Sequence, residues 1–151
     1  MATDELGAAS ATSSAIGAEP RDDARFGERY NASGAAALLA VEHEALGSDY
    51  QANGYTTMPQ ADELGRRLDL ASGRLLVDIG AGCGWPGLYL AKTTGCDLIS
   101  LDPVEEGVDL ARTRASRDGL ADRCRQIRAS AQQLPLRSRT VDAVVHTDVL
   151  C

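Results

Sequence analysis

The sequence is short of basic residues and of long apolar runs, and both shortages exclude classes of protein. Its 151 residues include 15 basic and 22 acidic side chains, which leaves a net charge of −7. Nucleic acids and anionic membranes are bound by basic surfaces, so we expect neither as a partner. No run approaches the roughly 20 apolar residues of a membrane span, and the polar first 20 residues do not resemble a secretory signal. We therefore predict a cytoplasmic protein that acts on small molecules.

The cysteines show no pattern typical of a metal site. Cys83, Cys96, Cys124 and Cys151 form no C-x-x-C pair, and we expect no metal. A cytoplasmic chain keeps its thiols reduced, so these residues are expected to pack in the core. Cys83 differs from the others because it lies within a glycine-rich stretch.

Composition and periodicity divide the chain into three parts. A hydrophobic content of 44% fits one globular domain rather than a disordered chain. Small and polar residues predict a disordered tail over residues 1–29. Helical patterns at residues 33–46 and 60–70 predict a helical cap or lid over residues 30–72. Residues 73–151 contain the strands and the ligand site described below.

The stretch that organises the chain is an apolar strand followed by alternate glycines and a helix. Residues 75–79 form the short apolar run of a strand buried on both faces, with Asp78 near its carboxyl end. Apolar residues at helical spacing follow Pro86, which suits the first turn of a helix. The helix N-terminus points its free amides at the loop, which favours a polar ligand. The glycines between strand and helix leave the backbone open to that ligand and allow positive φ: Gly80, Gly82 and Gly84.

The glycine spacing distinguishes between two kinds of nucleotide site. A dinucleotide fingerprint, G-x-G-x-x-G, would place its third glycine at Trp85, so the spacing disfavours a nicotinamide cofactor. The string Asp-x-Gly-x-Gly-x-Gly instead resembles motif I of class I S-adenosylmethionine-dependent methyltransferases. A tight turn that needs glycine only for its shape is the alternative.

The resemblance implies that the glycine loop binds the cofactor S-adenosylmethionine. In that family the loop passes under the methionine part of the cofactor. The acid before the loop helps to hold the amino group, directly or through water. Carried over to this chain, the resemblance implies that the cofactor-binding residues at the loop are Asp78, Gly80, Ala81, Gly82 and Gly84.

A second acid lies at the end of the next predicted strand. Residues 97–101 form an apolar strand that ends on Asp102, about 20 residues beyond the glycine loop, which is the length of one strand–helix–strand unit. A carboxylate there can accept hydrogen bonds from both hydroxyls of a ribose. It can also cap the helix predicted over residues 104–117. We predict that Asp102 binds the ribose, with Pro103 in the same site.

The next block of the family is matched only in part. Leu134 and Pro135, and a strand over residues 141–146, fit the family pattern. Aligned through that pair, Ser130 stands where the family usually has the acid that binds the adenine amino group. A serine hydroxyl accepts a hydrogen bond more weakly than a carboxylate. Ser130 is nevertheless predicted to contact the adenine, together with the backbone of Ala131.

Two further residues complete the predicted site. His146 ends the fourth strand, where ligands bind in open α/β folds, so it is the candidate catalytic base and a further cofactor contact. Its alternative role is a backbone contact alone. Tyr55 lies in residues 54–64, a segment similar to the lid that precedes motif I in some small-molecule methyltransferases. Its alternative role is ordinary packing on the sheet edge.

These elements predict an α/β fold with a Rossmann-like parallel sheet of order 3-2-1-4, helices on both faces and an N-terminal helical extension. The third strand is expected within residues 123–129. The resemblance covers about residues 50–151, and family members continue through three further strands. We therefore expect a truncated form of their seven-stranded fold. The fourth strand, residues 141–146, would then be an apolar edge through which the chain self-associates.

Three functions are compatible with these features. The first is S-adenosylmethionine-dependent methyl transfer to an unidentified small-molecule acceptor. Such a reaction needs mainly the alignment of a nucleophile with the activated methyl group and the exclusion of water. The second is a truncated S-adenosylmethionine-binding module without catalytic activity. The third, disfavoured by the glycine spacing, is a nicotinamide-dependent oxidoreductase.

Overall fold

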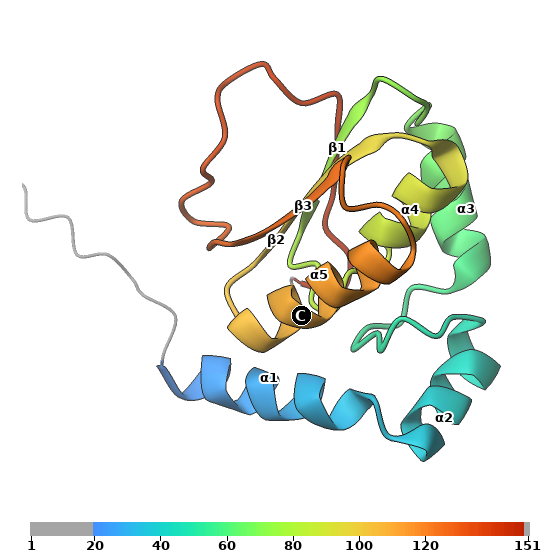
Figure 1. The fold of residues 1–151 in the computed structure, drawn as a ribbon, viewed down its shortest axis with the longest axis vertical. Coiled ribbons are helices and arrows are strands. Elements are labelled where there is room, and N and C mark those ends of the chain that lie inside the picture. The colour runs from blue at the N-terminus through green and yellow to red at the C-terminus, as the bar shows by residue number, and fades with distance from the viewer. Residues whose placement is uncertain (1–19, 150–151) are drawn as a thin grey trace, which may run out of the picture.

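A four-stranded parallel sheet of order β3-β2-β1-β4 lies at the centre of the molecule (Figure 1). This computed structural model describes residues 20–149. The parallel sheet and its strand order confirm the predicted fold class. The strands are β1 (Leu75–Ile79), β2 (Asp97–Asp102), β3 (Cys124–Arg128) and β4 (Ala143–Val145). The helices are α1 (Pro20–Ser33), α2 (Ala36–Leu46), α3 (Met58–Arg67), α4 (Gly87–Thr94) and α5 (Glu105–Arg117).

The register of the sheet brings the carboxyl ends of its strands to one edge. Val77 of β1 stands opposite Ile99 of β2 and Val144 of β4. β3 extends the sheet beyond β2, with Arg125 opposite Ile99. Because all four strands run in the same direction, the segments that follow β1, β2 and β4 emerge together, as a ligand site in an open α/β sheet requires.

The main hydrophobic core lies between one face of the sheet and the helices α4 and α5. The connections β1-α4-β2 and β2-α5-β3 step in the same direction, so right-handed crossovers place both helices on that face. Within residues 20–149 no helix packs on the second face, although the prediction placed helices on both. The core includes Leu76 and Leu98 of the sheet, Leu88, Leu90 and Ala91 of α4, and Ala111 and Ala115 of α5.

Helix α1 corrects the predicted N-terminal tail. Residues 20–29, which were assigned to a disordered tail, form most of α1, while residues 1–19 lie outside the described part of the chain. α1 packs against α5, and its Tyr30 is only 7% exposed. A polar helix of this kind is stabilised by packing against the rest of the fold rather than by its own composition. For that reason the local sequence did not reveal it.

Two helices begin at positions other than those predicted. α2 begins at Ala36 rather than at residue 33, because Ser33 is still part of α1 and Ala35, in an extended conformation, is the N-cap residue of α2. α3 begins at Met58 rather than at residue 60, because Thr57 caps it in a capping box. None of the helices within residues 20–149 combines the length and the apolar character that crossing a membrane requires.

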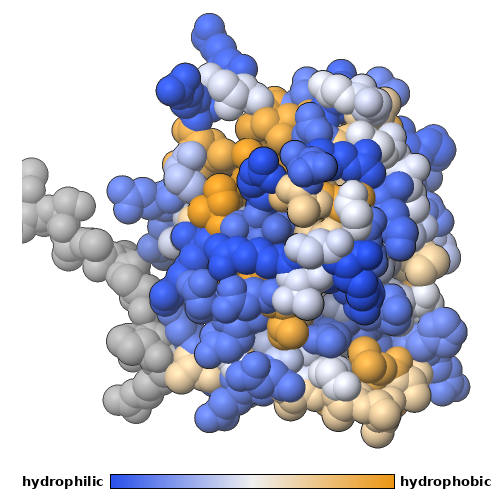
Figure 2. All heavy atoms as spheres, viewed as in Figure 1, coloured by the Kyte–Doolittle hydropathy of each residue, from blue (hydrophilic) through white to orange (hydrophobic). Residues whose placement is uncertain are grey.

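β4 is shorter than predicted. Regular pairing starts only at Ala143, because the carboxylate of Asp142 accepts the hydrogen bond of the Leu75 amide, 2.7 Å away. Val144, on the second face of the sheet, is 49% exposed. The loop 129–142 that leads into β4 lies beside this face (Figure 1), and Figure 2 shows apolar residues gathered in the same region. The predicted strand over residues 141–146 is thus confirmed in position but not in length.

Three of the four cysteines pack in the interior, as predicted. Cys83, Cys96 and Cys124 are buried and free, and Cys151 lies outside the described residues. Within residues 20–149, no three His, Cys, Asp or Glu side chains lie close enough together to hold a metal ion.

Candidate functional site

The glycine loop joins β1 to α4 at the carboxyl edge of the sheet. Gly80 and Gly82 have φ values of 73° and 50°, and together with Ala81 they line a cavity. Gly84, with a φ of 101°, faces the interior instead, where an added Cβ would collide with the side chain of Leu88. Of the three glycines predicted to contact a ligand, two therefore border the cavity and the third serves the packing of α4.

Asp102 lies directly behind this loop, at the end of β2. It is 4% exposed, and its two oxygens accept hydrogen bonds from the amides of Gly82 and Val104, at 2.8 and 2.9 Å. Burial raises the pKa of Asp102, and the two amide hydrogen bonds oppose that rise. Asp102 does not itself line the cavity, and its contact with a ribose stays a prediction. The N-cap residue of α5 is Val104 and no side chain within residues 20–149 caps the helix, so the predicted capping by Asp102 is wrong.

Asp78 lies outside the cavity. Its side chain is on the same face of β1 as Leu76, is 1% exposed, and accepts a hydrogen bond from the Gly87 amide at 2.9 Å. Burial raises the pKa of Asp78 to about 7, while the hydrogen bond from Gly87 opposes the rise. The alternation of side chains along a strand already pairs Asp78 with Leu76, so the sequence contained this signal. The predicted contact with a ligand amino group stays a prediction that this position does not favour.

The cavity beside the loop has a wall that comes from the N-terminal region. Its volume is about 70 Å³. Phe26 and Tyr30 of α1 line it, facing the glycine loop, residues 52–54, and Thr147 and Asp148 after β4. Figure 1 shows α1 running across the end of the sheet from which the loop emerges. Neither aromatic residue was among the predicted site residues, because nothing in the local pattern places this helix over the loop.

Comparisons with known proteins agree with this geometry. Residues 77–151 match a family model described as a methyltransferase domain. The chain belongs to the class I S-adenosylmethionine-dependent methyltransferases. Membership confirms the resemblance seen in motif I and, at the level of the family, the predicted cofactor.

Curated methyltransferases that resemble the chain are much longer. Methyltransferase GfsG of Streptomyces halstedii is 31% identical over 83 residues, which cover 55% of this chain and 30% of the relative. Sterol 24-C-methyltransferase ERG6 of Saccharomyces cerevisiae is 25% identical over 88 residues, which cover 58% of this chain and 23% of the relative. The chain thus spans less than a third of the length of these relatives.

Solved methyltransferase structures share the fold. One is an S-adenosylmethionine-dependent methyltransferase from Thiobacillus denitrificans in complex with S-adenosyl-L-homocysteine, with a TM-score of 0.54 and 24% identity over 60% of this chain and 36% of the other. Another is geranyl diphosphate C-methyltransferase from Streptomyces coelicolor, with a TM-score of 0.55 and 22% identity over 58% of this chain and 33% of the other.

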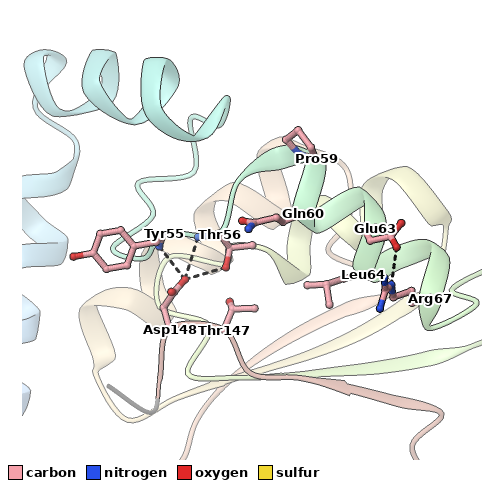
Figure 3. Close-up of a pocket in the computed structure, with 9 residues that line it drawn as sticks. All are labelled: Tyr55, Thr56, Pro59, Gln60, Glu63, Leu64, Arg67, Thr147 and Asp148. Atoms are coloured by element: carbon pink, nitrogen blue, oxygen red, sulfur yellow. Dashed lines mark hydrogen bonds and ion pairs between the residues drawn. The ribbon is translucent and has the colours of Figure 1, made fainter.

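The segment after β4 places Thr147 and Asp148, rather than His146, beside the cavity. His146 is exposed and does not line the cavity. The Asp148 carboxylate accepts hydrogen bonds from the amides of Tyr55 and Thr56, at 2.9 and 3.2 Å, and from the Thr56 hydroxyl at 3.0 Å (Figure 3). The prediction chose the titratable histidine of this segment, whereas the residue two positions later connects the sheet to the N-terminal region.

Tyr55 lies at the rim of a larger, open groove. This groove of about 550 Å³ is formed by residues of α3, by Tyr55 and Thr56, and by Thr147 and Asp148. The Tyr55 side chain is 83% exposed, and Figure 3 shows it directed away from the other residues of the groove. Packing on the sheet edge, the alternative role for Tyr55, is therefore wrong, and the lid role stays a prediction.

The predicted adenine contacts lie near Asp102 but outside the cavity. Pro103 follows Asp102 directly, and the Ala129 amide donates to the Asp102 carbonyl at 3.0 Å. This hydrogen bond brings Ser130 and Ala131, which are both exposed, to the same end of β2. The structure therefore groups these residues on one side of Asp102, and their contact with an adenine stays a prediction.

Proposed function

We propose that this methyltransferase binds S-adenosylmethionine against the backbone of the glycine loop and transfers its methyl group to a small-molecule acceptor. The observation that carries the proposal is the cavity beside Gly80, Ala81 and Gly82, with the buried carboxylate of Asp102 behind it. Glycines without a Cβ let a ligand approach the main chain. Membership of the family favours S-adenosylmethionine over the other nucleosides that such a loop could hold.

Asp102 is the proposed partner of the ribose. A ribose offers two hydroxyl donors, and the carboxylate keeps acceptor positions beyond its hydrogen bonds to Gly82 and Val104. Ser130 and the backbone of Ala131 are the proposed adenine contacts, because they reach the same end of β2 through the hydrogen bond of their neighbour to Asp102. Serine in place of an acid would make this adenine contact weaker.

The cofactor needs more room than the cavity offers. Sites for small molecules usually enclose about 300–1,000 Å³, whereas the cavity measures about 70 Å³. We expect the wall at residues 147–149 to move, because the hydrogen bonds of Asp148 to Tyr55 and Thr56 are exposed to solvent. Val149 stands over the loop, where a Cβ added to Gly80 would be 2.5 Å from its side chain. Movement of this wall would uncover the glycine backbone.

Methyl transfer places modest demands on side chains. The cofactor supplies an activated methyl group when bound, and the chain has to hold the acceptor in line with it and exclude water. We propose that Tyr55 takes part in this exclusion as a lid residue of the helical cap, residues 30–72. His146 is the candidate base for an acceptor that loses a proton, although its exposed side chain lies outside the cavity.

A small-molecule acceptor is supported by the relatives and by the charge. The names of the relatives, a sterol 24-C-methyltransferase and a geranyl diphosphate C-methyltransferase, favour this class of acceptor for the chain as well. The net charge of −7 disfavours nucleic-acid and anionic-membrane partners. We propose that the methyltransferase acts in the cytoplasm.

The alternative is an S-adenosylmethionine-binding module without activity of its own. The observation that favours it is that the chain contains the glycine loop and Asp102 yet spans less than a third of its curated relatives. Release of S-adenosylhomocysteine from S-adenosylmethionine in the presence of sterol and isoprenoid diphosphate acceptors separates the two. Cofactor binding without any release would favour the module.

We also propose that the chain associates with a second copy through β4. Within residues 20–149, β4 ends the sheet and is paired on one edge only, with β1. Val144 is 49% exposed on the second face of the sheet. An unpaired strand edge is a template for another strand. Sedimentation should therefore show a dimer whose fraction grows with concentration, and a monomer at every concentration would contradict it.

Calorimetric titration of a Gly82→Ala variant with S-adenosylhomocysteine tests the proposed cofactor site. A Cβ at Gly82 would enter the cavity and lie 3.0 Å from the Tyr30 hydroxyl. Gly73 is the matched control, because its φ is also positive, at 84°, and nothing lies within 4 Å of an added Cβ. We expect Gly82→Ala to lose most of its affinity and Gly73→Ala to keep it. Equal affinities would mean that the cofactor does not lie against Gly82.

A further inference from the structure

The hydroxyl of one buried tyrosine lies beside the cavity. Tyr30 of α1 is 7% exposed and lines the cavity beside the glycine loop. Ser33 bonds to the Tyr30 carbonyl, whereas the Tyr30 hydroxyl is not one of the fully buried, unpartnered polar atoms of residues 20–149 and is open to solvent in the cavity. A hydroxyl that opens into a cavity from a closely packed ring can exchange bound water for a ligand atom.

The ring of Tyr30 occupies space that Gly82 and Gly107 leave open because they have no side chains. A Cβ added to Gly82 would be 3.0 Å from the hydroxyl, and a Cβ added to Gly107 would be 3.0 Å from the ring atom Cε2. The ring thus fits closely between the glycine loop and the first turns of α5. Cys83 and Val104 pack around it in a small second core. Packing fixes the ring and, with it, the position of the hydroxyl beside Gly82.

The hydroxyl is a hydrogen-bond donor at neutral pH. Burial raises the pKa of Tyr30, and the carboxylate of Asp102 raises it further. The hydroxyl therefore keeps its proton. Gly82 connects the two groups, because its amide donates to Asp102 while its open face meets the Tyr30 hydroxyl. A donor and an acceptor thus flank the residue against which the cofactor is proposed to lie.

We propose that Tyr30 is a cofactor-binding residue whose hydroxyl donates a hydrogen bond to an oxygen atom of bound S-adenosylmethionine. This inference rests on the proposed function. The cofactor carries oxygens in its ribose and in its amino-acid carboxylate, and both accept hydrogen bonds. The contact gives α1 a direct part in the site, beside the loops that follow the strands.

Titration of a Tyr30→Phe variant with S-adenosylhomocysteine tests the proposal, because only the hydroxyl is removed. We expect affinity to fall roughly five- to tenfold, the scale of one hydrogen bond between neutral or singly charged groups. Tyr50→Phe is the matched control. Tyr50 is 5% exposed, packs in the main core and does not line the cavity, so its loss of a hydroxyl should leave affinity unchanged.

A second ligand locates the oxygen. 5′-Methylthioadenosine keeps the ribose and lacks the amino acid. A loss of affinity for both ligands in Tyr30→Phe places the hydrogen bond on the ribose, and a loss for S-adenosylhomocysteine alone places it on the carboxylate. Unchanged or higher affinity for S-adenosylhomocysteine overturns the proposal and leaves the proposed function standing. Failure of the wild-type chain to bind S-adenosylhomocysteine overturns the proposed function, and this inference with it.

A measurement on the unmodified chain tests the proposal even if the Tyr30→Phe variant fails to fold. With ¹³C at Cζ of each tyrosine, the signals of Tyr30 and Tyr50 can be followed during the titration. The Tyr30 signal should shift as S-adenosylhomocysteine binds, because its hydroxyl gains an acceptor, while the Tyr50 signal stays in place. A Tyr30 signal that does not move at saturation would overturn the proposal.

Discussion

The loop after β1 and the segment around β4 border the same cavity, but they are held in different ways. Around the loop, two buried carboxylates accept hydrogen bonds from backbone amides, Asp78 from Gly87 and Asp102 from Gly82. Around β4, the strand has three residues, and the hydrogen bonds of Asp148 are exposed to solvent. Solvent-exposed hydrogen bonds and little apolar burial are the marks of a segment that opens easily. The loop is therefore the fixed side of the cavity, and we expect residues 147–149 to be the side that adapts.

A substitution inside the fixed side should have the largest effect. Gly84 has a φ of 101°, and an added Cβ would collide with Leu88. We expect Gly84→Ala to lower the free energy of unfolding by about 2–5 kcal/mol, through backbone strain and overpacking. Gly119→Ala, at a φ of 71° with nothing within 4 Å of the new Cβ, should cost only about 1–2 kcal/mol. Urea denaturation measures both, and equal losses would show that the loop is not closely packed.

The carboxylate behind the loop should dominate cofactor affinity. We expect Asp102→Ala to weaken S-adenosylhomocysteine binding by about 1.5–3 kcal/mol, the scale of a hydrogen bond to a charged group. The variant also removes the acceptor of the Gly82 amide, which holds the loop. Asp97→Ala, at the exposed start of the same strand, is the control and should bind normally. Calorimetric titration measures both affinities. Normal binding by Asp102→Ala would show that Asp102 does not bind the ribose.

The fixed side of the site was also the more predictable one. The apolar run of residues 75–79, the glycine spacing after it and Asp102 at the end of the next strand are local patterns, and each predicted an element that the structure contains. Burial on both faces leaves a parallel strand little choice of residue type, so the sequence signal there is strong. The alternation of side chains along β1 also places Asp78 on the same face as Leu76, but the prediction did not use this alternation.

The adapting side and the N-terminal wall could not be predicted in the same way. α1 is polar along most of its length, and Tyr30 reaches the cavity only because Gly82 and Gly107 lack side chains. That arrangement depends on contacts between segments far apart in the sequence. β4 is short because the carboxylate of Asp142, and not a backbone carbonyl, accepts the hydrogen bond of the Leu75 amide. The periodicity of apolar residues does not reveal such a side-chain contact. We predicted His146 as a site residue because its side chain can transfer a proton. Asp148, two positions later, lines the cavity instead.

Asp78 should give the fixed side a pH dependence. Burial raises its pKa from 3.8 to about 7 in the folded chain. Between about pH 4 and pH 7 the folded state therefore keeps a proton that the unfolded state has lost, and the contribution of this group to stability is lost as the pH rises. Asp78→Asn does not titrate, so its stability relative to the wild type should rise over this range. Thermal melting across it measures the difference, and a constant difference would show that Asp78 is ionised throughout.

The smallest effect is expected at β4. Val144→Lys places a charge on the exposed face of the last strand and should weaken self-association several-fold, because charged side chains discourage pairing between strand edges. Val41→Lys is the control, since Val41 is 62% exposed on α2, away from the sheet. Sedimentation of both variants at matched concentrations measures the change. If both dissociate equally, net charge rather than the β4 edge governs association.

The central claim is that the glycine loop belongs to an S-adenosylmethionine site and not to a dinucleotide site. Titration of the unmodified chain with S-adenosylhomocysteine and, separately, with NADH tests it most directly, because the glycine spacing is the feature that separates the two. We expect saturable binding of S-adenosylhomocysteine with one site per chain and no heat of binding from NADH. Binding of NADH by a folded chain that ignores S-adenosylhomocysteine would contradict it.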